Sequence, residues 1–270
     1  MHNQSIHIRS MIHHWFTKRT FLILFSGLLG WFGINFAYAN GLEVSPTMLL
    51  LKSNQVASQL WISHTAQTDL NHPMYAQIRV FRWTQAENQD RLIPTNQLIV
   101  TPPFFVVQGQ TPQLVRVLRT NQIETDSSQT PLMMAQGNEQ SYRLIVDQIP
   151  KRDHPGGGLM FVMHYSIPVF IAPAHPTHPW DVSALTWHWV VEKNLVYLQI
   201  TNPTSFHAQI VNVSALLNGQ WKSLNHGLMG YVLPEKTMQF KVPLSPSELS
   251  KTHQIQVWIN GQEQHAEVTP

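Results

Sequence analysis

The side chains of this chain that could do chemistry are few, and none of them forms a known catalytic or metal-binding pattern. His175 and His178 stand three residues apart in a proline-rich stretch, with Asp181 as the only nearby carboxylate. That set is too small to predict a metal site. His164 lies inside an apolar run and is expected to be a half-exposed strand residue. Cysteine is absent, which excludes thiolate nucleophiles, thiolate metal sites and disulfides.

The common sequence motifs of enzymes are also missing. There is no GxSxG, HExxH, P-loop or strand-linked GxGxxG. The glycine run at 156–158 lies between two predicted strands and favours a flexible hairpin loop over a phosphate site. The carboxylates Glu87, Asp90 and Asp126 are interpreted as loop residues. We therefore expect that the protein is not an enzyme and binds no cofactor or metal.

Residues 1–39 predict a secretory signal peptide. A basic pair at 18–19 precedes an apolar run at 21–36, and Ala-Tyr-Ala follows at 37–39. The apolar run is shorter than the roughly 20 residues that span a bilayer. An uncleaved N-terminal anchor is the alternative. The working protein is expected to begin at Asn40 and to act outside the cytoplasm.

Removal of this leader changes the charge of the chain. The leader holds three of the 17 basic residues and none of the 15 acidic ones, so the rest has a net charge of −1. The pI of 8.9 therefore comes largely from the leader. A nearly neutral chain lacks the basic surface with which proteins bind nucleic acids, so we expect no nucleic-acid partner.

The rest of the chain is predicted to be all-β. Apolar residues recur at period two and prolines, glycines and asparagines separate the runs, as in a series of short strands. Asn-Gly pairs at 218–219 and 260–261 predict tight hairpins. No window of the chain shows a convincing amphipathic helix. The strands are expected at 42–44, 48–51, 60–62, 74–83, 97–100, 113–119, 141–149, 159–171, 184–191, 195–201, 206–217, 230–233, 238–242, 252–259 and 264–268.

A change of composition divides this β pattern into two parts. The segment 173–180 contains three prolines and two histidines, and proline stiffens a chain and blocks strand pairing. We interpret it as a linker. The prediction is an N-terminal β-sandwich at 40–172 and a C-terminal β-sandwich at 181–270.

The run at 159–171 is more apolar than a strand with one wet face should be. It also closes the first predicted domain, where an edge strand is common. An apolar edge strand promotes aggregation unless something covers it. One explanation is that the strand extends the sheet of a partner protein. The other is a central strand that is buried on both faces.

Ten short segments, taken in order, give the chain a specific resemblance. Together they are similar to the PapD-like family of pilus-assembly chaperones of the chaperone–usher pathway, and the second and last segments look most like its archaic branch. The segments are VSPT at 44–47, RVFRWTQ at 79–85, DRLIPT at 90–95, VTPPF at 100–104, VRVLR at 115–119, SYRL at 141–144, QIP at 148–150, IPVF at 167–170, NPT at 202–204 and GYVLP at 230–234.

This resemblance implies two immunoglobulin-like β-sandwiches at an angle around a cleft, in a protein of the Gram-negative periplasm. Such a chaperone lends its G1 strand to pilus subunits that lack their own last strand, and delivers them to an outer-membrane usher. G1 maps onto 159–171. An exposed G1 edge also allows self-association of the free protein.

One face of G1 should enter the groove of the subunit, because alternate side chains share a face. We expect the bulkier face, which contains no ionisable group. Its residues are Leu159, Phe161, Met163 and Tyr165, and those of the other face are Met160, Val162 and His164.

The carboxylate anchor of the family departs from its pattern here. Conventional members hold the terminal carboxylate of the subunit with one arginine and one lysine, and those positions correspond to Met48 and Ser166. Neither is cationic. The candidates for a replacement are Arg79, Arg116 and Arg143, each in a predicted strand of the first domain.

Two other classes of function fit the sequence less well. A secreted structural protein, such as a two-domain pilin or adhesin, should carry an extra N-terminal donor segment and lack its final strand. Here a strand is predicted to begin at Leu42, and the first domain has a full set. A periplasmic hydrolase on a sandwich scaffold is disfavoured by the missing motifs.

Overall fold

In the computed structural model, residues 41–64, 73–109, 111–120, 136–150 and 162–269 are described. The predicted signal peptide and the loop at 156–158 lie outside these ranges. Among the described residues no helix is both long and apolar enough to cross a membrane.

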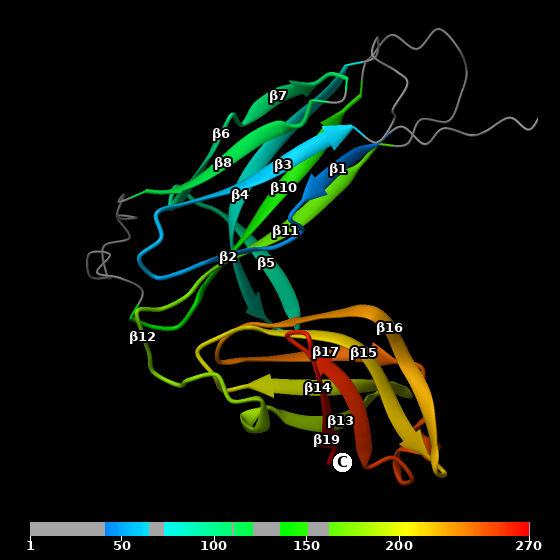
Figure 1. The fold of residues 1–270 in the computed structure, drawn as a ribbon. Coiled ribbons are helices and arrows are strands. Elements are labelled where there is room, and N and C mark those ends of the chain that lie inside the picture. Colours follow the sequence, from blue (N-terminus) through cyan, green and yellow to red (C-terminus); the bar gives the residue numbers. More distant parts are fainter. Residues whose placement is uncertain (1–40, 65–72, 110, 121–135, 151–161, 270) are drawn as a thin grey trace, which may run out of the picture. The chain divides into compact units, whose positions relative to one another are not determined.

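The described chain is built almost entirely from β-strands, as predicted (Figure 1). Two sheets pack face to face around each of two separate apolar cores. The first part contains β1 (Leu42–Ser45), β2 (Leu49–Leu51), β3 (Ala57–His64), β4 (Met74–Ala86), β5 (Gln89–Pro94), β6 (Leu98–Thr101), β7 (Phe104–Val107), β8 (Gln113–Arg119), β9 (Gln136–Gly137), β10 (Gln140–Ile149) and β11 (His164–Ile171).

The first sandwich has one sheet in the order β1-β3-β8-β6 and another in the order β2-β11-β10-β4-β5, with β7 paired to β4. Period-two alternation explains why these segments are strands. In β8, Val115 and Val117 are buried in the core while Arg116 between them is exposed. The core side chains from both sheets include Leu60, Ile78 and Leu144.

The second sandwich has one sheet in the order β13-β14-β17 and another in the order β16-β15-β18-β19. Its two predicted hairpins are confirmed, because Asn218-Gly219 joins β15 to β16 and Asn260-Gly261 joins β18 to β19 with positive φ at all four residues. Its elements are η1 (Val182–Ala184), β13 (Thr186–Glu192), β14 (Leu195–Asn202), β15 (Ala208–Leu217), β16 (Gln220–Val232), β17 (Lys236–Val242), α2 (Pro246–Leu249), β18 (Gln254–Ile259) and β19 (Gln262–Glu267).

Three local predictions need correction. Asp90 lies in β5 and not in a loop, because β5 pairs with the far half of the long strand β4. The predicted linker contains β12 (His175–Pro176), which pairs in parallel with β9. The strand expected at 159–171 begins at His164 within the described residues, and Val162 and Met163 precede it outside the strand.

Candidate functional site

Strand β11 is paired along only part of its length on one side. It pairs with β10 from His164 to Ile171, but with β2 only at 169–171. The edge at 164–168 therefore faces no other strand among the described residues. Burial changes two residues earlier, because residues 167–171 are all buried whereas 164–166 are exposed or half-buried. Half of the strand is sealed and half has an open edge.

The two faces of β11 have different surroundings. Ile167, Val169 and Ile171 lie in the core of the first sandwich, and Tyr165 packs against that core from the rim. The Tyr165 hydroxyl donates to the backbone carbonyl of Leu42. The predicted donor face thus has the same parity as the core face of β11. Of its four residues, Met163 and Tyr165 are described and both are half-buried. Leu159 and Phe161 lie outside the described residues.

Arg143 lies where the opposite face of β11 meets the second sandwich. Arg143 is on β10 opposite Pro168, and its Nη1 donates to the Ser166 carbonyl at 3.3 Å. Its guanidinium carbon stands 3.7 Å from the centre of the Trp83 ring and 5.3 Å from that of Tyr231. A charged group is thereby held between aromatic rings, an arrangement that stabilises cations.

These rings belong to a small apolar cluster, the junction cluster, which consists of Trp83, Phe170, Tyr231 and Leu233. Met48 packs against it. Of the two positions that correspond to the missing basic pair, Arg143 thus contacts Ser166 directly, and Met48 packs against the same junction cluster as the rings around Arg143.

Arg143 remains positively charged although it is partly buried. Burial lowers the pKa of its guanidinium, and the nearby negative charge of Asp90 opposes that shift. The side chain forms no ion pair with a described carboxylate. Asp90 instead accepts a hydrogen bond from the Gln85 amide at 2.9 Å. A guanidinium has five N–H donors, and among the described residues the Ser166 carbonyl is the only group that accepts a hydrogen bond from Arg143.

The other two candidate arginines have different environments. Arg79 lies on the same face of the same sheet but pairs with Asp147 at 2.8 Å. Burial would raise the pKa of Asp147, yet hydrogen bonds from Arg79 and His164 outweigh it and lower that pKa. Arg116 is exposed on β8, in the opposite sheet, beside Gln59 and Thr101. The structure thus separates Arg116 from the other two.

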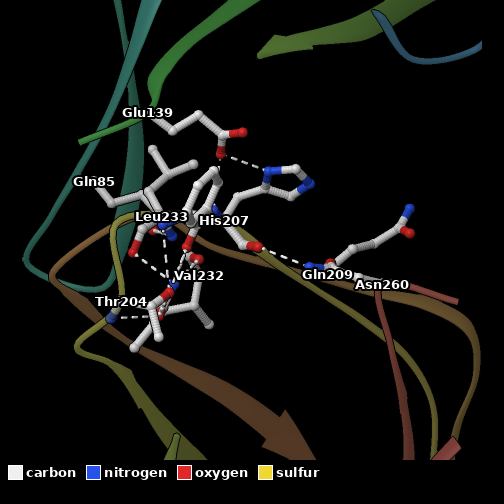
Figure 2. Close-up of polar contacts among 10 residues, drawn as sticks. Gln85, Glu139, Thr204, His207, Gln209, Val232, Leu233 and Asn260 are labelled. Atoms are coloured by element: carbon white, nitrogen blue, oxygen red, sulfur yellow. Dashed lines mark hydrogen bonds and ion pairs between the residues drawn. The ribbon is translucent and has the colours of Figure 1, made fainter. Parts of the chain in front are cut away.

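A polar network crosses from the first sandwich to the second beside the junction cluster (Figure 2). The buried Gln85 amide donates to the Tyr231 carbonyl and accepts from the Leu233 amide, both at 2.9 Å. Glu139 accepts from the backbone N–H of His207 at 2.8 Å and meets its ring Nδ1 at 2.6 Å. That ring stacks on Phe170 at 3.6 Å. The Gln85 hydrogen bond thus joins the Tyr231 backbone to β4, the strand that also carries Trp83.

No residue pattern in the sequence singles out Trp83, Gln85, Tyr231, Glu139 and His207 as functional residues. A signal was present, because three of the segments that carry the resemblance meet at this junction. They are the segments at 79–85, 167–170 and 230–234. Across the described residues, no group of three or more His, Asp or Glu side chains is placed so that it could hold a metal ion.

Comparison with known proteins gives one consistent result. Residues 41–177 match the family described as pili and flagellar-assembly chaperone, PapD N-terminal domain. The chaperone protein PmfD of Proteus mirabilis is 22% identical over 221 residues, which are 80% of this chain and 78% of PmfD.

Solved structures show the same fold. One is the complex of the chaperone CsuC with the tip adhesion subunit CsuE, from the archaic chaperone–usher Csu pili of Acinetobacter baumannii. It matches with a TM-score of 0.59 and 23% identity over 84% of this chain and 98% of the matched chain. Another is the Salmonella enterica SafA pilin with the SafB chaperone, with a TM-score of 0.58 and 18% identity over 85% and 97%.

Proposed function

We propose, from the premise that this chain belongs to the PapD family of pilus-assembly chaperones, that it holds unfinished pilus subunits in the periplasm by lending them part of β11. An unfinished subunit exposes an apolar groove and unpaired strand edges. The observation that carries the proposal is the edge at 164–168, which is open on one side while the rest of the strand is sealed. The backbone of this edge can pair with a partner strand.

The apolar run ahead of β11 supplies the side chains for the groove. By sequence parity Leu159 and Phe161 belong with Met163 and Tyr165, so in an extended segment these four side chains would share one face. The same side of one strand would then serve the chaperone core and, further along, the groove of the subunit. Each large apolar side chain that becomes fully buried contributes about 1.5–3 kcal/mol.

Arg143 is the best of the three candidates for the carboxylate anchor. It lies on the sheet that contains β11, touches Ser166 and has no described ion-pair partner. Arg79 is already paired with Asp147, and Arg116 lies on the other sheet. A guanidinium held between rings can bind a carboxylate through two parallel hydrogen bonds.

The wider role follows from the family. The chaperone would pass its subunit to an outer-membrane usher, and the leader would direct it to the periplasm. When no subunit is bound, the open edge of β11 would also be available for a second copy of the chain. None of these steps requires a cofactor or a catalytic residue.

The test is co-expression with a tagged subunit from the same assembly system, followed by co-purification. We expect a soluble 1:1 complex with the wild-type chain and a large loss with Phe161→Ala. The matched control is Val162→Ala. Val162 belongs to the other predicted face of G1 and is 47% exposed. Capture that survives Phe161→Ala but fails with Val162→Ala would assign the groove to the other face. If Phe161→Ala impairs the folding of the free chaperone as much as it impairs capture, Phe161 belongs to the core of the chaperone and not to the subunit groove.

Charge reversal tests the anchor in the same assay. Arg143→Glu should abolish capture, whereas Arg116→Glu should leave it unchanged. Loss with Arg116→Glu alone would move the anchor to the opposite sheet.

A further inference from the structure

The guanidinium of Arg143 is held by residues of both sandwiches. Trp83 on β4 forms one wall, and Tyr231 on β16 forms the other. The two rings meet edge to face, with centres 5.3 Å apart and planes at 83°. This arrangement confines the guanidinium from two directions.

Tyr231 is itself fixed by several contacts. Only 6% of the residue is exposed. Its hydroxyl accepts a hydrogen bond from Gln209 at 3.0 Å, and its backbone carbonyl accepts one from Gln85. Burial raises the pKa of the phenol, so the ring stays neutral beside the cation. The position of this wall therefore depends on contacts with both sandwiches.

Aromatic walls suit a guanidinium that has to bind an anion. They attract the cation through their faces but offer it no carboxylate, so its N–H groups remain available. A free arginine side chain loses about 2 kcal/mol of rotamer entropy when it is ordered. Walls that order it in advance remove that cost from binding.

We propose that Trp83 and Tyr231 are positioning residues for carboxylate recognition by Arg143, so that the second sandwich contributes to a site whose cation comes from the first. This inference rests on the proposed anchor role of Arg143. It predicts that a change at Tyr231 weakens recognition of the carboxylate without removing any group that touches it.

The probe is a short synthetic peptide of alternating valine and threonine, prepared with a free C-terminal carboxylate or with a C-terminal amide. The measured quantity is the ratio of the two dissociation constants, the carboxylate preference. Hydrogen bonds to charged groups predict a preference of roughly ten- to a hundredfold for the wild-type chain. General loosening of the protein weakens both peptides alike, so it does not change the ratio.

Arg143→Gln should reduce the preference to about one. Tyr231→Leu should reduce it to about threefold or less, and the conservative Tyr231→Phe, which keeps the ring, should restore it. Leu233→Ala is the matched control, because Leu233 lies in the same junction cluster but is not one of the two rings over the Arg143 guanidinium. It should leave the preference unchanged.

Trp83→Phe is a second variant in case Tyr231→Leu does not fold. The Trp83 indole nitrogen is buried without a described hydrogen-bond partner, so phenylalanine removes no such bond. It presents a smaller wall and should lower the preference several-fold.

The outcomes separate the two proposals. A preference that survives Arg143→Gln refutes the anchor. A preference lost with Arg143→Gln but intact in both Tyr231→Leu and Trp83→Phe refutes the positioning role alone. Loss with Tyr231→Phe as well would show that the hydroxyl and not the ring is needed, which also overturns the inference.

Discussion

Replacement of Gln85 by leucine should weaken the contact between the two sandwiches. Gln85 is 4% exposed, and its amide donates to the Tyr231 carbonyl and accepts from the Leu233 amide. Leucine has a similar volume but neither group, so both backbone atoms lose their partner. A buried polar group without a partner costs about 1–3 kcal/mol. We expect a loss of about 2–4 kcal/mol in the free energy of unfolding.

Urea denaturation measures this loss. A slope of about 2–3 kcal/mol per molar converts it into a midpoint lower by roughly 1 M. The junction couples the two sandwiches, so in Gln85→Leu the two sandwiches should also unfold less cooperatively than in the wild-type chain. Intrinsic fluorescence follows both, because Trp83 lies at the junction and Trp187 and Trp189 lie in the second core.

The matched control is Gln77→Leu on the same strand. Gln77 is exposed, so its loss should cost little. If Gln85→Leu shifts the midpoint no more than Gln77→Leu does, the two hydrogen bonds do not stabilise the junction and the reasoning is wrong.

Three further predictions concern other parts of the chain. Glu139→Ala should cost about 1–3 kcal/mol, because the backbone and ring N–H groups of His207 lose a buried acceptor, and chemical denaturation will measure it. Gly230→Ala should cost about 1–3 kcal/mol because its Cβ would overlap the Phe240 ring, and a double variant with Phe240→Leu should recover part of the melting temperature. The hydrogen bond from Lys222, with those from Ser245, lowers the pKa of Glu248 to about 2 from an ordinary value of 4.5. Its stabilisation is complete above pH 4.5 and disappears as the pH falls towards 2, and Lys222→Met should raise this pKa in an NMR titration.

The sequence predicted the features that depend on local chemistry. Period-two patterns located most strands, because each strand has one face in a core and one towards water. Val115, Arg116 and Val117 illustrate this rule. The two Asn-Gly hairpins were predictable because few residues accept positive φ at adjacent positions.

Features that depend on the partner of a strand could not be predicted in this way. Strand β5 is exposed at every residue, so it lacks the apolar alternation that reveals a strand. It forms because β4 is long enough to pair with it beyond β7. Arg143 could not be preferred over Arg79 from the sequence, because Asp147, the ion-pair partner of Arg79, is 68 residues away from it.

The two ends of β11 differ in a way that fits the proposed lending of this strand to a subunit, because the end that the fold needs is not the end with the open edge. Val169 and Ile171 lie in the first core, and Phe170 lies in the junction cluster, so the end of the strand is fixed by both sandwiches. The beginning of the strand has an open edge and is less buried, so we expect it to contribute less to the stability of the protein. Val169→Ala should therefore destabilise the free protein, by about 1–3 kcal/mol, whereas changes ahead of His164 should alter mainly the binding of a subunit. Because binding and stability depend on different ends of one strand, subunit contacts can change without loss of the fold.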